Sequence, residues 1–452
     1  MSAVLLCLAV VVFFHHVPQA LRWPARLLLV GAAGWLIFVA IQTLRTVRLT
    51  GKNLVFSLIL GSLFYAALSL VCHVFIGLMS KRDHRISTRD LTSLTEDRRV
   101  EIKAMLNGTS YEMYDRDIGW VPRPGFKSDT IQISRQGLRS LREYPETPPE
   151  AEKRILCMGD SFTFGYAVSD NETYPYHAEQ LRPGTEWINL GISGTCLTQS
   201  LLYYRKAGKK FGGKHVVIGF MTDDAKRTVN CFRPFVNPGN PFTKPFAKYS
   251  NGAFSIEPNP YQDRSDYRRL LANERREIDR LREIDYLTWS NQAATSNPIL
   301  RTAQFCYETL HLDRNINSIL CRPSQKPSIK RKVVVDPYGT AIWNPGSPGF
   351  TALTRILDFY YHEIIADGRV PLIVIIPGPL DVEEYNKQLP RQYASLVDHF
   401  KLKGYRFLDF LDPLVTRHKD DLSYHTLFVE AHYRGAVNKV LAEEIIKALD
   451  LP

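Results

Sequence analysis

The residues around Ser161 have the types and spacing that nucleophilic chemistry needs. An apolar run at residues 155–158 leads directly into Gly159-Asp160-Ser161 and then into a small-residue turn at Gly165. This order predicts a buried strand that delivers Ser161 at its carboxyl end, where open α/β sheets place their ligands. A serine hydroxyl is a poor nucleophile unless a base takes its proton and hydrogen-bond donors receive the oxyanion. The rest of the chain must therefore supply a base and donors.

Three later segments are candidates for those roles. The run Asn-Leu-Gly-Ile-Ser-Gly ends at Gly194, where a strand-to-helix turn can aim a main-chain N–H at a ligand. Polar residues beginning at Thr222 follow another apolar run. His432 lies in Phe-Val-Glu-Ala-His, just before the last predicted helix, and Glu430 is the acid nearest to it. His425 is the rival base. We expect these segments to meet Ser161 at one edge of a sheet.

The elements that must position these residues follow from the alternation of apolar and amphipathic stretches. From residue 154 onward this alternation predicts a three-layer α/β/α domain with a mostly parallel sheet. The expected strands are residues 155–158, 186–190, 215–220, 370–376 and 405–410. The expected helices are residues 173–181, 198–206, 263–287, 351–366, 382–401 and 436–449.

Taken together, these motifs resemble the SGNH (GDSL-type) esterase and acyltransferase superfamily, over residues 154–227 and 368–449. The resemblance implies that Ser161 is the nucleophile, that Gly194 is an oxyanion-hole residue and that His432 is the base. More narrowly, Gly-Asp-Ser-Phe-Thr-Phe-Gly, with Ile-Gly-Trp-Val-Pro and Gln-Gly-Leu-Arg before it, resembles membrane-anchored bacterial members. Those members are generally taken to act outside the cytoplasm.

This chain departs from the family pattern at two places. The third block normally reads Asn-Asp and supplies an amide donor to the oxyanion, whereas this chain has Thr222-Asp223-Asp224. Thr222 can donate only through a shorter, rotatable hydroxyl. The acid that orients the base usually stands three residues before it, whereas Glu430 stands two before His432. We expect Ser161, His432 and Glu430 to be catalytic, and Ser161, Gly194 and Thr222 to form the oxyanion hole.

The function expected from these residues is serine-dependent ester hydrolysis through an acyl-enzyme, on a carbohydrate or lipid ester. The family resemblance makes deacetylation of an envelope polysaccharide one form of this activity. Two alternatives stay open, namely an O-acyltransferase that modifies an exopolysaccharide or envelope glycan, and a catalytically weak glycan-binding module. The expected partners are an ester-bearing small molecule or glycan and a lipid bilayer. No metal or organic cofactor is implied, and the oligomeric state is open.

Three apolar runs almost free of charge, at residues 5–14, 27–44 and 54–79, precede the predicted α/β domain. Because about 20 apolar residues span a bilayer, the second and third runs predict transmembrane helices, and the first predicts a shorter membrane helix. The expected organisation is a membrane region with two or three transmembrane helices at 1–80, a linker and small β-rich segment at 81–150, and the SGNH-like domain at 151–452 with an insertion at about 230–345. Basic residues flank these runs on both sides, so their count leaves the orientation open. The resemblance implies a multi-pass inner-membrane protein with a periplasmic or extracellular catalytic domain.

Charge and cysteine content narrow the remaining possibilities. The net charge of +11 indicates anionic surroundings such as lipid head groups or an acidic polymer. The basic residues are scattered along the chain, which argues against nucleic-acid binding. The chain has seven cysteines but no C-x-x-C pair, so a structural zinc site is not expected. Cys306 and Cys321 could form a disulfide outside the cytoplasm, or remain free.

Overall fold

The computed structural model describes residues 91, 93–148, 150, 153–236, 240–285 and 342–450, with seven further residues between 62 and 71. The chain divides into two compact units, one formed by residues 1–90 with 290–337 and the other by residues 91–289 with 338–452. Nearly all described residues belong to the second unit, and the fold below is that of this unit.

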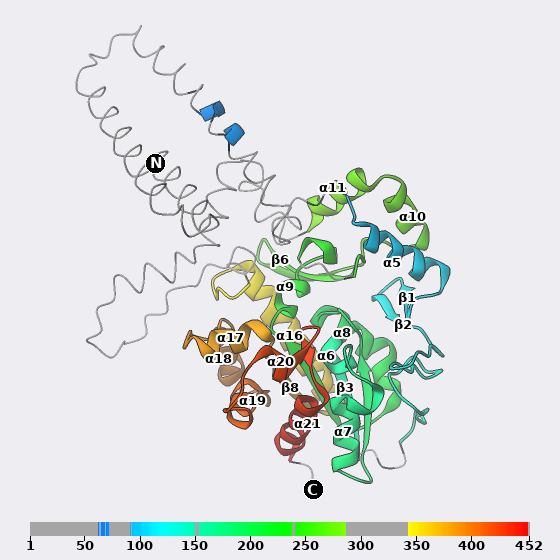
Figure 1. Cartoon of the computed structure of the whole chain (residues 1–452), viewed down its shortest axis with the longest axis vertical. Coiled ribbons are helices and arrows are strands. Elements are labelled where there is room, and N and C mark those ends of the chain that lie inside the picture. Colours follow the sequence, from blue (N-terminus) through cyan, green and yellow to red (C-terminus); the bar gives the residue numbers. More distant parts are fainter. Residues whose placement is uncertain are drawn as a thin grey trace, which may run out of the picture. The chain divides into compact units, whose positions relative to one another are not determined.

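A five-stranded parallel sheet, in the order β4-β3-β5-β8-β9, forms the centre of this unit (Figure 1). Its strands are β3 (Arg154–Gly159), β4 (Glu186–Gly191), β5 (His215–Met221), β8 (Val370–Ile376) and β9 (Phe407–Asp409). The first strand of this sheet, β3, lies between the second and the third, β4 and β5, so the strand order reverses beside β3. In open α/β sheets, ligands bind outside the carboxyl ends of the strands at such a reversal. The structure confirms the α/β class with a parallel sheet.

Helices cover both faces of the sheet, because alternate residues of each strand point to opposite sides. Along β3, Leu156 and Met158 face one apolar core, whereas Ile155 and Cys157 face the other. Helices α8 and α16 cover the first face, and α7, α19 and α21 cover the second. These helices are α7 (Tyr174–Leu181), α8 (Leu197–Tyr203), α16 (Pro348–Ala366), α19 (Leu411–Arg417) and α21 (Gly435–Leu449). The result is three layers, α/β/α.

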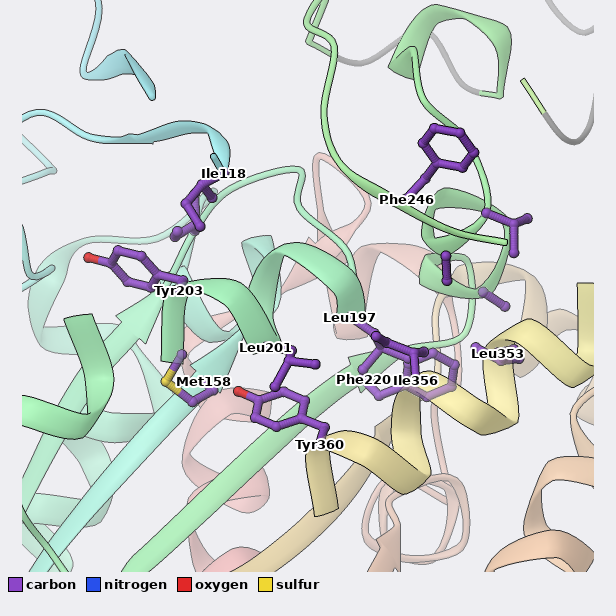
Figure 2. Close-up of a cluster of buried hydrophobic side chains, with 14 of the residues drawn as sticks. Ile118, Met158, Leu197, Leu201, Tyr203, Phe220, Phe246, Leu353, Ile356 and Tyr360 are labelled. Atoms are coloured by element: carbon purple, nitrogen blue, oxygen red, sulfur yellow. The ribbon is translucent and has the colours of Figure 1, made fainter. Parts of the chain in front are cut away.

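Figure 2 shows the first core in detail. Leu197 and Leu201 of α8 lie beside Ile356 and Tyr360 of α16, over Phe220 of β5. All five side chains are buried. This contact holds α8 against the sheet, and α8 begins directly after the loop that contains Gly194.

A short segment before the sheet and an insertion after β5 complete the unit. The first contains α5 (Glu96–Asn107) and an antiparallel hairpin of β1 (Glu112–Asp115) and β2 (Gly119–Pro122). The described part of the insertion contains α9 (Asp224–Thr228), η6 (Arg233–Phe235), the β6–β7 hairpin (Phe246–Ser250 and Ala253–Glu257), α10 (Arg264–Ala272) and α11 (Glu274–Ile284). Short elements elsewhere are α6 (Ser161–Phe164), η3 (Asp170–Glu172), η4 (Tyr204–Gly208), η5 (Lys209–Phe211), α17 (Pro379–Asn386), α18 (Ala394–Lys403), α20 (Tyr424–Leu427), β10 (Phe428–Val429) and β11 (His432–Tyr433).

Two predicted helices are wrong in their extent. The charged helix expected at 263–287 is two helices, α10 and α11, because Asn273 leaves the helical conformation with φ −139° and ψ 53°. The helix expected at 382–401 is likewise two helices, α17 and α18. Pro390 lies between them, and a proline cannot continue a helix because its ring clashes with the preceding turn.

Several expectations fall on residues outside the described part of the chain. They include the apolar runs at 5–14 and 27–44, most of the run at 54–79, and the pair Cys306 and Cys321. Among the described residues, no helix combines the length and the apolar character that a membrane span needs. The described cysteines, Cys157, Cys196 and Cys231, are buried and free.

Candidate active site

Ser161 lies at the strand-order reversal, immediately after β3 and at the first position of the short helix α6. Asp160 caps this helix, since its carboxylate accepts a 2.9 Å hydrogen bond from the Phe162 N–H. Neighbouring β4 passes so close to α6 that a Cβ on Gly191 would lie 2.3 Å from the Phe164 nitrogen. A glycine is therefore required there for α6 to lie against the sheet.

His432 reaches Ser161 from a tight hairpin near the carboxyl terminus. Strands β10 and β11 pair Val429 with His432, leaving Glu430 and Ala431 as the two-residue loop. Both loop residues have positive φ, 48° and 62°, as a type I′ hairpin turn requires. Neither is glycine, so the turn is held in a conformation that L-residues avoid. The Tyr424 hydroxyl accepts a 2.7 Å hydrogen bond from the Ala431 N–H, which stabilises the turn.

The imidazole of His432 connects Ser161 to the main chain of its own turn. Its Nε2 lies 2.8 Å from the Ser161 Oγ, and its Nδ1 lies 2.7 Å from the carbonyl oxygen of Glu430. A carbonyl oxygen only accepts hydrogen bonds, so Nδ1 must carry a proton. In the neutral ring Nε2 is then unprotonated and can accept the Ser161 hydroxyl proton. The geometry is that of a nucleophile with its general base.

Two aromatic rings enclose this imidazole. The Phe162 ring centroid lies 4.9 Å from that of His432, and the Tyr166 centroid lies 5.2 Å from it. Phe162 is buried, while Tyr166 is 39% exposed. Desolvation by these neighbours lowers the pKa of His432 below its ordinary value of 6.5, although the Glu430 carbonyl and the Asp160 charge oppose the shift. The base is therefore neutral, and able to accept a proton, at neutral pH.

Gly194 lies in a turn that is bonded to the end of β3, two residues before Ser161. The Ile192 N–H donates to the Gly159 carbonyl at 3.0 Å, and the Thr195 N–H closes the turn onto the Ile192 carbonyl at 3.4 Å. Gly194 itself has φ 71°, and a Cβ there would lie 2.4 Å from the Asn240 Oδ1. The fold thus brings the Gly194 turn close to Ser161. A side chain at position 194 is excluded both by the positive φ and by the contact with Asn240.

Thr222 stands at the carboxyl end of β5, on the other side of β3, but its hydroxyl is directed elsewhere. Its Oγ1 donates a 2.6 Å hydrogen bond to the Oδ2 of Asp381, which also accepts from the Gly378 N–H at 2.8 Å. A hydroxyl has one proton to donate. In this arrangement Thr222 therefore links β5 to the start of α17, and its proton is not directed at the Ser161 hydroxyl.

Glu430 contributes a different atom from the one expected. The sequence pattern predicts that its carboxylate orients His432, whereas the atom that contacts the imidazole is its main-chain carbonyl oxygen. The Glu430 side chain is exposed. The carbonyl oxygen of the rival histidine, His425, accepts a hydrogen bond from Arg434, and its ring contacts that of Tyr424.

Two motifs from the segment before the sheet brace the site. The indole N–H of Trp120, from Ile-Gly-Trp-Val-Pro, donates a 2.9 Å hydrogen bond to the Ser193 carbonyl in the Gly194 turn. The guanidinium of Arg139, from Gln-Gly-Leu-Arg, donates to the carbonyls of Gly165 and Val168 just after α6. Both side chains are buried. These N-terminal motifs therefore support the two turns that the candidate chemistry needs.

Sequence reasoning missed several residues of this site. Tyr166 lies just after α6. Asn240 comes from a loop, Arg227 from α9 and Asp381 from α17, and the positions of these three depend on the packing of segments distant in the chain. For Asp381 a signal existed, because it follows the Pro377-Gly378-Pro379 turn at the end of a predicted strand. The described ranges contain no cluster of three or more His, Cys, Asp or Glu residues placed to hold a metal ion.

Comparison with known proteins yields structural matches only. No protein-family model matches the chain, and no curated protein matches it. The structure of a protein described as a lipolytic protein of the G-D-S-L family, from Desulfitobacterium hafniense, aligns with a TM-score of 0.31 at 12% identity, over 66% of this chain and 99% of that one. A protein described as an acylhydrolase, from Bacteroides fragilis, aligns with a TM-score of 0.31 at 13% identity, over 67% of this chain and 89% of that one.

The Glu430→Gln variant should change kcat/KM for an ester by less than about threefold, because the exposed carboxylate makes only a weak, solvent-screened contribution. The carbonyl that holds Nδ1 is unchanged by this substitution. Steady-state kinetics of the purified variant measures the effect. A loss near 10⁴-fold, the size seen when a triad acid is neutralised, would show instead that the carboxylate orients His432.

The pH dependence of kcat/KM should show an acid limb with its midpoint below 6.5, because burial lowers the pKa of His432 from that ordinary value. The sign follows from the role of the ring. Activity requires the neutral imidazole, so it rises as pH increases through the His432 pKa and then levels off. A midpoint above 6.5 would mean that the ring is stabilised as imidazolium in the free enzyme, contrary to the desolvated setting seen here.

Proposed function

We propose that this chain is a serine-dependent ester hydrolase that acts through an acyl-enzyme. The observation that carries the proposal is the 2.8 Å contact between the Ser161 Oγ and the His432 Nε2 at the carboxyl edge of a parallel sheet. The resemblance of the sequence motifs to the SGNH superfamily points the same way. Ser161 is the nucleophile of the proposed reaction and His432 its general base.

The proposed reaction runs in two halves. As the Ser161 Oγ forms a bond to the ester carbonyl carbon, its proton passes to the His432 Nε2. The tetrahedral intermediate collapses, the ester C–O bond breaks, and the imidazolium returns its proton to the departing alcohol. A water molecule then attacks the acyl carbon as its proton passes to the His432 Nε2. The bond between the acyl carbon and the Ser161 Oγ breaks, the acid leaves, and the imidazolium returns the proton to Oγ.

The oxyanion of each intermediate needs N–H donors, and we assign the main-chain N–H groups of Ser161 and Gly194 to this role. The position of the Gly194 turn, bonded to Gly159, supports the assignment. Thr222 is not included, because its hydroxyl donates to Asp381. Loss of one oxyanion donor costs roughly 10²–10³ in rate, so two main-chain donors predict a slower enzyme than a site with three.

The substrate class we propose is an ester of a carbohydrate or lipid, and the apolar runs before the folded unit favour a membrane-attached enzyme facing the cell envelope. An O-acyltransferase differs only in the second half of the reaction, where a sugar hydroxyl replaces water. A glycan-binding module would lack the acyl-enzyme altogether.

Mass spectrometry of the protein quenched during turnover of p-nitrophenyl acetate tests the proposal. We expect one acetyl group, mapped by peptide digestion to Ser161 and absent from Ser161→Ala. Repeating the reaction with an oligosaccharide acceptor distinguishes transfer from hydrolysis, because transfer acetylates the sugar. Turnover without an acetylated Ser161 would refute the nucleophile, and absence of turnover alongside glycan binding would favour the binding module.

A further inference from the structure

Within the described residues, Asp160 provides the only carboxylate in contact with Ser161 or the imidazole of His432. Its Oδ2 lies 3.4 Å from the Ser161 Oγ, on the side of the serine, while the Nδ1 of His432 is bonded to a neutral carbonyl. General-base catalysis creates a positive charge on His432, and in a serine triad an aspartate at Nδ1 stabilises that charge. Here the anion lies next to the nucleophile instead.

Asp160 is part of a buried charge cluster. Arg227, from α9, places its Nη1 3.6 Å from the Asp160 Oδ2 and 2.9 Å from the Asp224 Oδ1. All three side chains are at most 5% exposed. Asp223, whose carboxylate lies 3.7 Å from Arg227, is the most exposed member at 34%. The Arg227 guanidinium thus forms ion pairs with two buried carboxylates, those of Asp160 and Asp224.

Burial alone raises the pKa of these carboxyl groups, because a low dielectric penalises the charged form. Desolvation raises the pKa of Asp160, and the Arg227 charge followed by the Phe162 N–H opposes the rise. Burial, followed by the Asp160 charge, raises the pKa of Asp224 well above its ordinary value, although the charges of Arg227 and Arg233 oppose the rise. Arg227 is therefore the main charged group that favours an ionised Asp160.

Three charged residues act on the pKa of His432. Asp160 raises its pKa, Arg227 lowers it by a smaller amount, and the exposed Glu430 raises it least. The rings of Phe162 and Tyr166 add no formal charge. Removing Arg227 would withdraw its own small effect but would also raise the pKa of Asp160 and so weaken the larger effect of the Asp160 charge. The net result would be a less stable imidazolium.

We propose that the Asp160 carboxylate stabilises the imidazolium of His432 during acyl transfer, and that Arg227 is a positioning residue that keeps Asp160 ionised. The inference rests on the proposed function, in which the Ser161 proton passes to Nε2. In this proposal the charge pair of Asp160 and Arg227 has the role that a carboxylate at the Nδ1 of His432 has in a serine triad.

Kinetic variants on p-nitrophenyl acetate test this pair. Asp160→Asn should lower kcat/KM by about tenfold and move the acid limb of the pH profile to lower pH, since a tenfold change corresponds to one pH unit of imidazolium stability. Arg227→Met should do the same, and Arg227→Lys should lose less. In the double variant the loss should stay near that of a single one, because both changes remove the same charge. Multiplying losses, or an unmoved acid limb, would overturn the proposal.

A second measurement covers the case in which Arg227→Met fails to fold, since it leaves two buried carboxylates without their cation. NMR titration of the His432 ring in Ser161→Ala, assigned by comparison with His432→Ala, reads the imidazolium directly without turnover. Adding Asp160→Asn should lower the titration midpoint, whereas adding Glu430→Gln should move it less. An unchanged midpoint in Asp160→Asn would refute the inference. If the wild type shows no ester turnover, the proposed function fails while this titration still reports on Asp160.

Discussion

Replacing Ser161 by alanine should abolish nearly all ester turnover, lowering kcat by roughly 10³-fold or more, because the nucleophile and its base act as one unit. The Ser161 Oγ lies 2.8 Å from the His432 Nε2, and without the hydroxyl there is neither a nucleophile nor a proton for the imidazole to accept. The substitution removes one side-chain oxygen and should change the free energy of unfolding by only about 1 kcal/mol. The measurement is kcat on a p-nitrophenyl ester, with a parallel thermal melt.

The control for this prediction is the His432→Ala variant and its combination with Ser161→Ala. If the two residues form one catalytic unit, each single variant should lose about as much activity as the double variant. Losses that multiply would show that the two side chains act in separate steps. Activity retained in Ser161→Ala would place the nucleophile elsewhere, and a serine-reactive phosphonate would then label a different residue.

Replacing Trp120 by alanine should lower the free energy of unfolding by about 3–5 kcal/mol, the range for removing a buried tryptophan. Trp120 is 0% exposed, and its ring packs 5.6 Å from that of Phe242 in the insertion. Its indole N–H also holds the Ser193 carbonyl in the Gly194 turn. The variant should therefore lose both stability and activity, measured by chemical denaturation and by kcat/KM.

The Trp120→Phe variant separates packing from the hydrogen bond. It keeps most of the ring but leaves the Ser193 carbonyl unpaired, which costs about 1–3 kcal/mol and loosens the turn that presents Gly194. Trp187→Phe is a matched control, because Trp187 is also buried and donates its N–H to the Thr185 Oγ1 at 2.9 Å, near the amino end of β4. We expect similar destabilisation in both variants but lower kcat/KM only in Trp120→Phe. Equal activities would show that the turn does not depend on this bond.

Local patterns in the sequence were sufficient to indicate the sheet and its central serine. Parallel strands are apolar on both faces, so the runs before Gly159 and Thr222 were visible as strands without knowledge of their neighbours. The same patterns located Ser161 at a strand end and His432 before the last helix. Helix extent was predicted less well. The break at Asn273 in the charged segment carries no strong local signal, whereas Pro390 does mark the break between α17 and α18, and the single helix predicted at 382–401 ran through it.

The sequence by itself determined that an α/β sheet presents Ser161 at its carboxyl edge, because the strand, the turn and the serine are adjacent in the chain. Only the tertiary structure decided which atoms surround that serine. The strained turn at Glu430 and Ala431 assigns Nδ1 to a carbonyl rather than a carboxylate. The packing of α9 brings Arg227 to Asp160, and Asp381, at the start of α17, accepts the hydrogen bond from the Thr222 hydroxyl. Such contacts depend on distances between segments far apart in the chain, and residue order does not encode those distances locally.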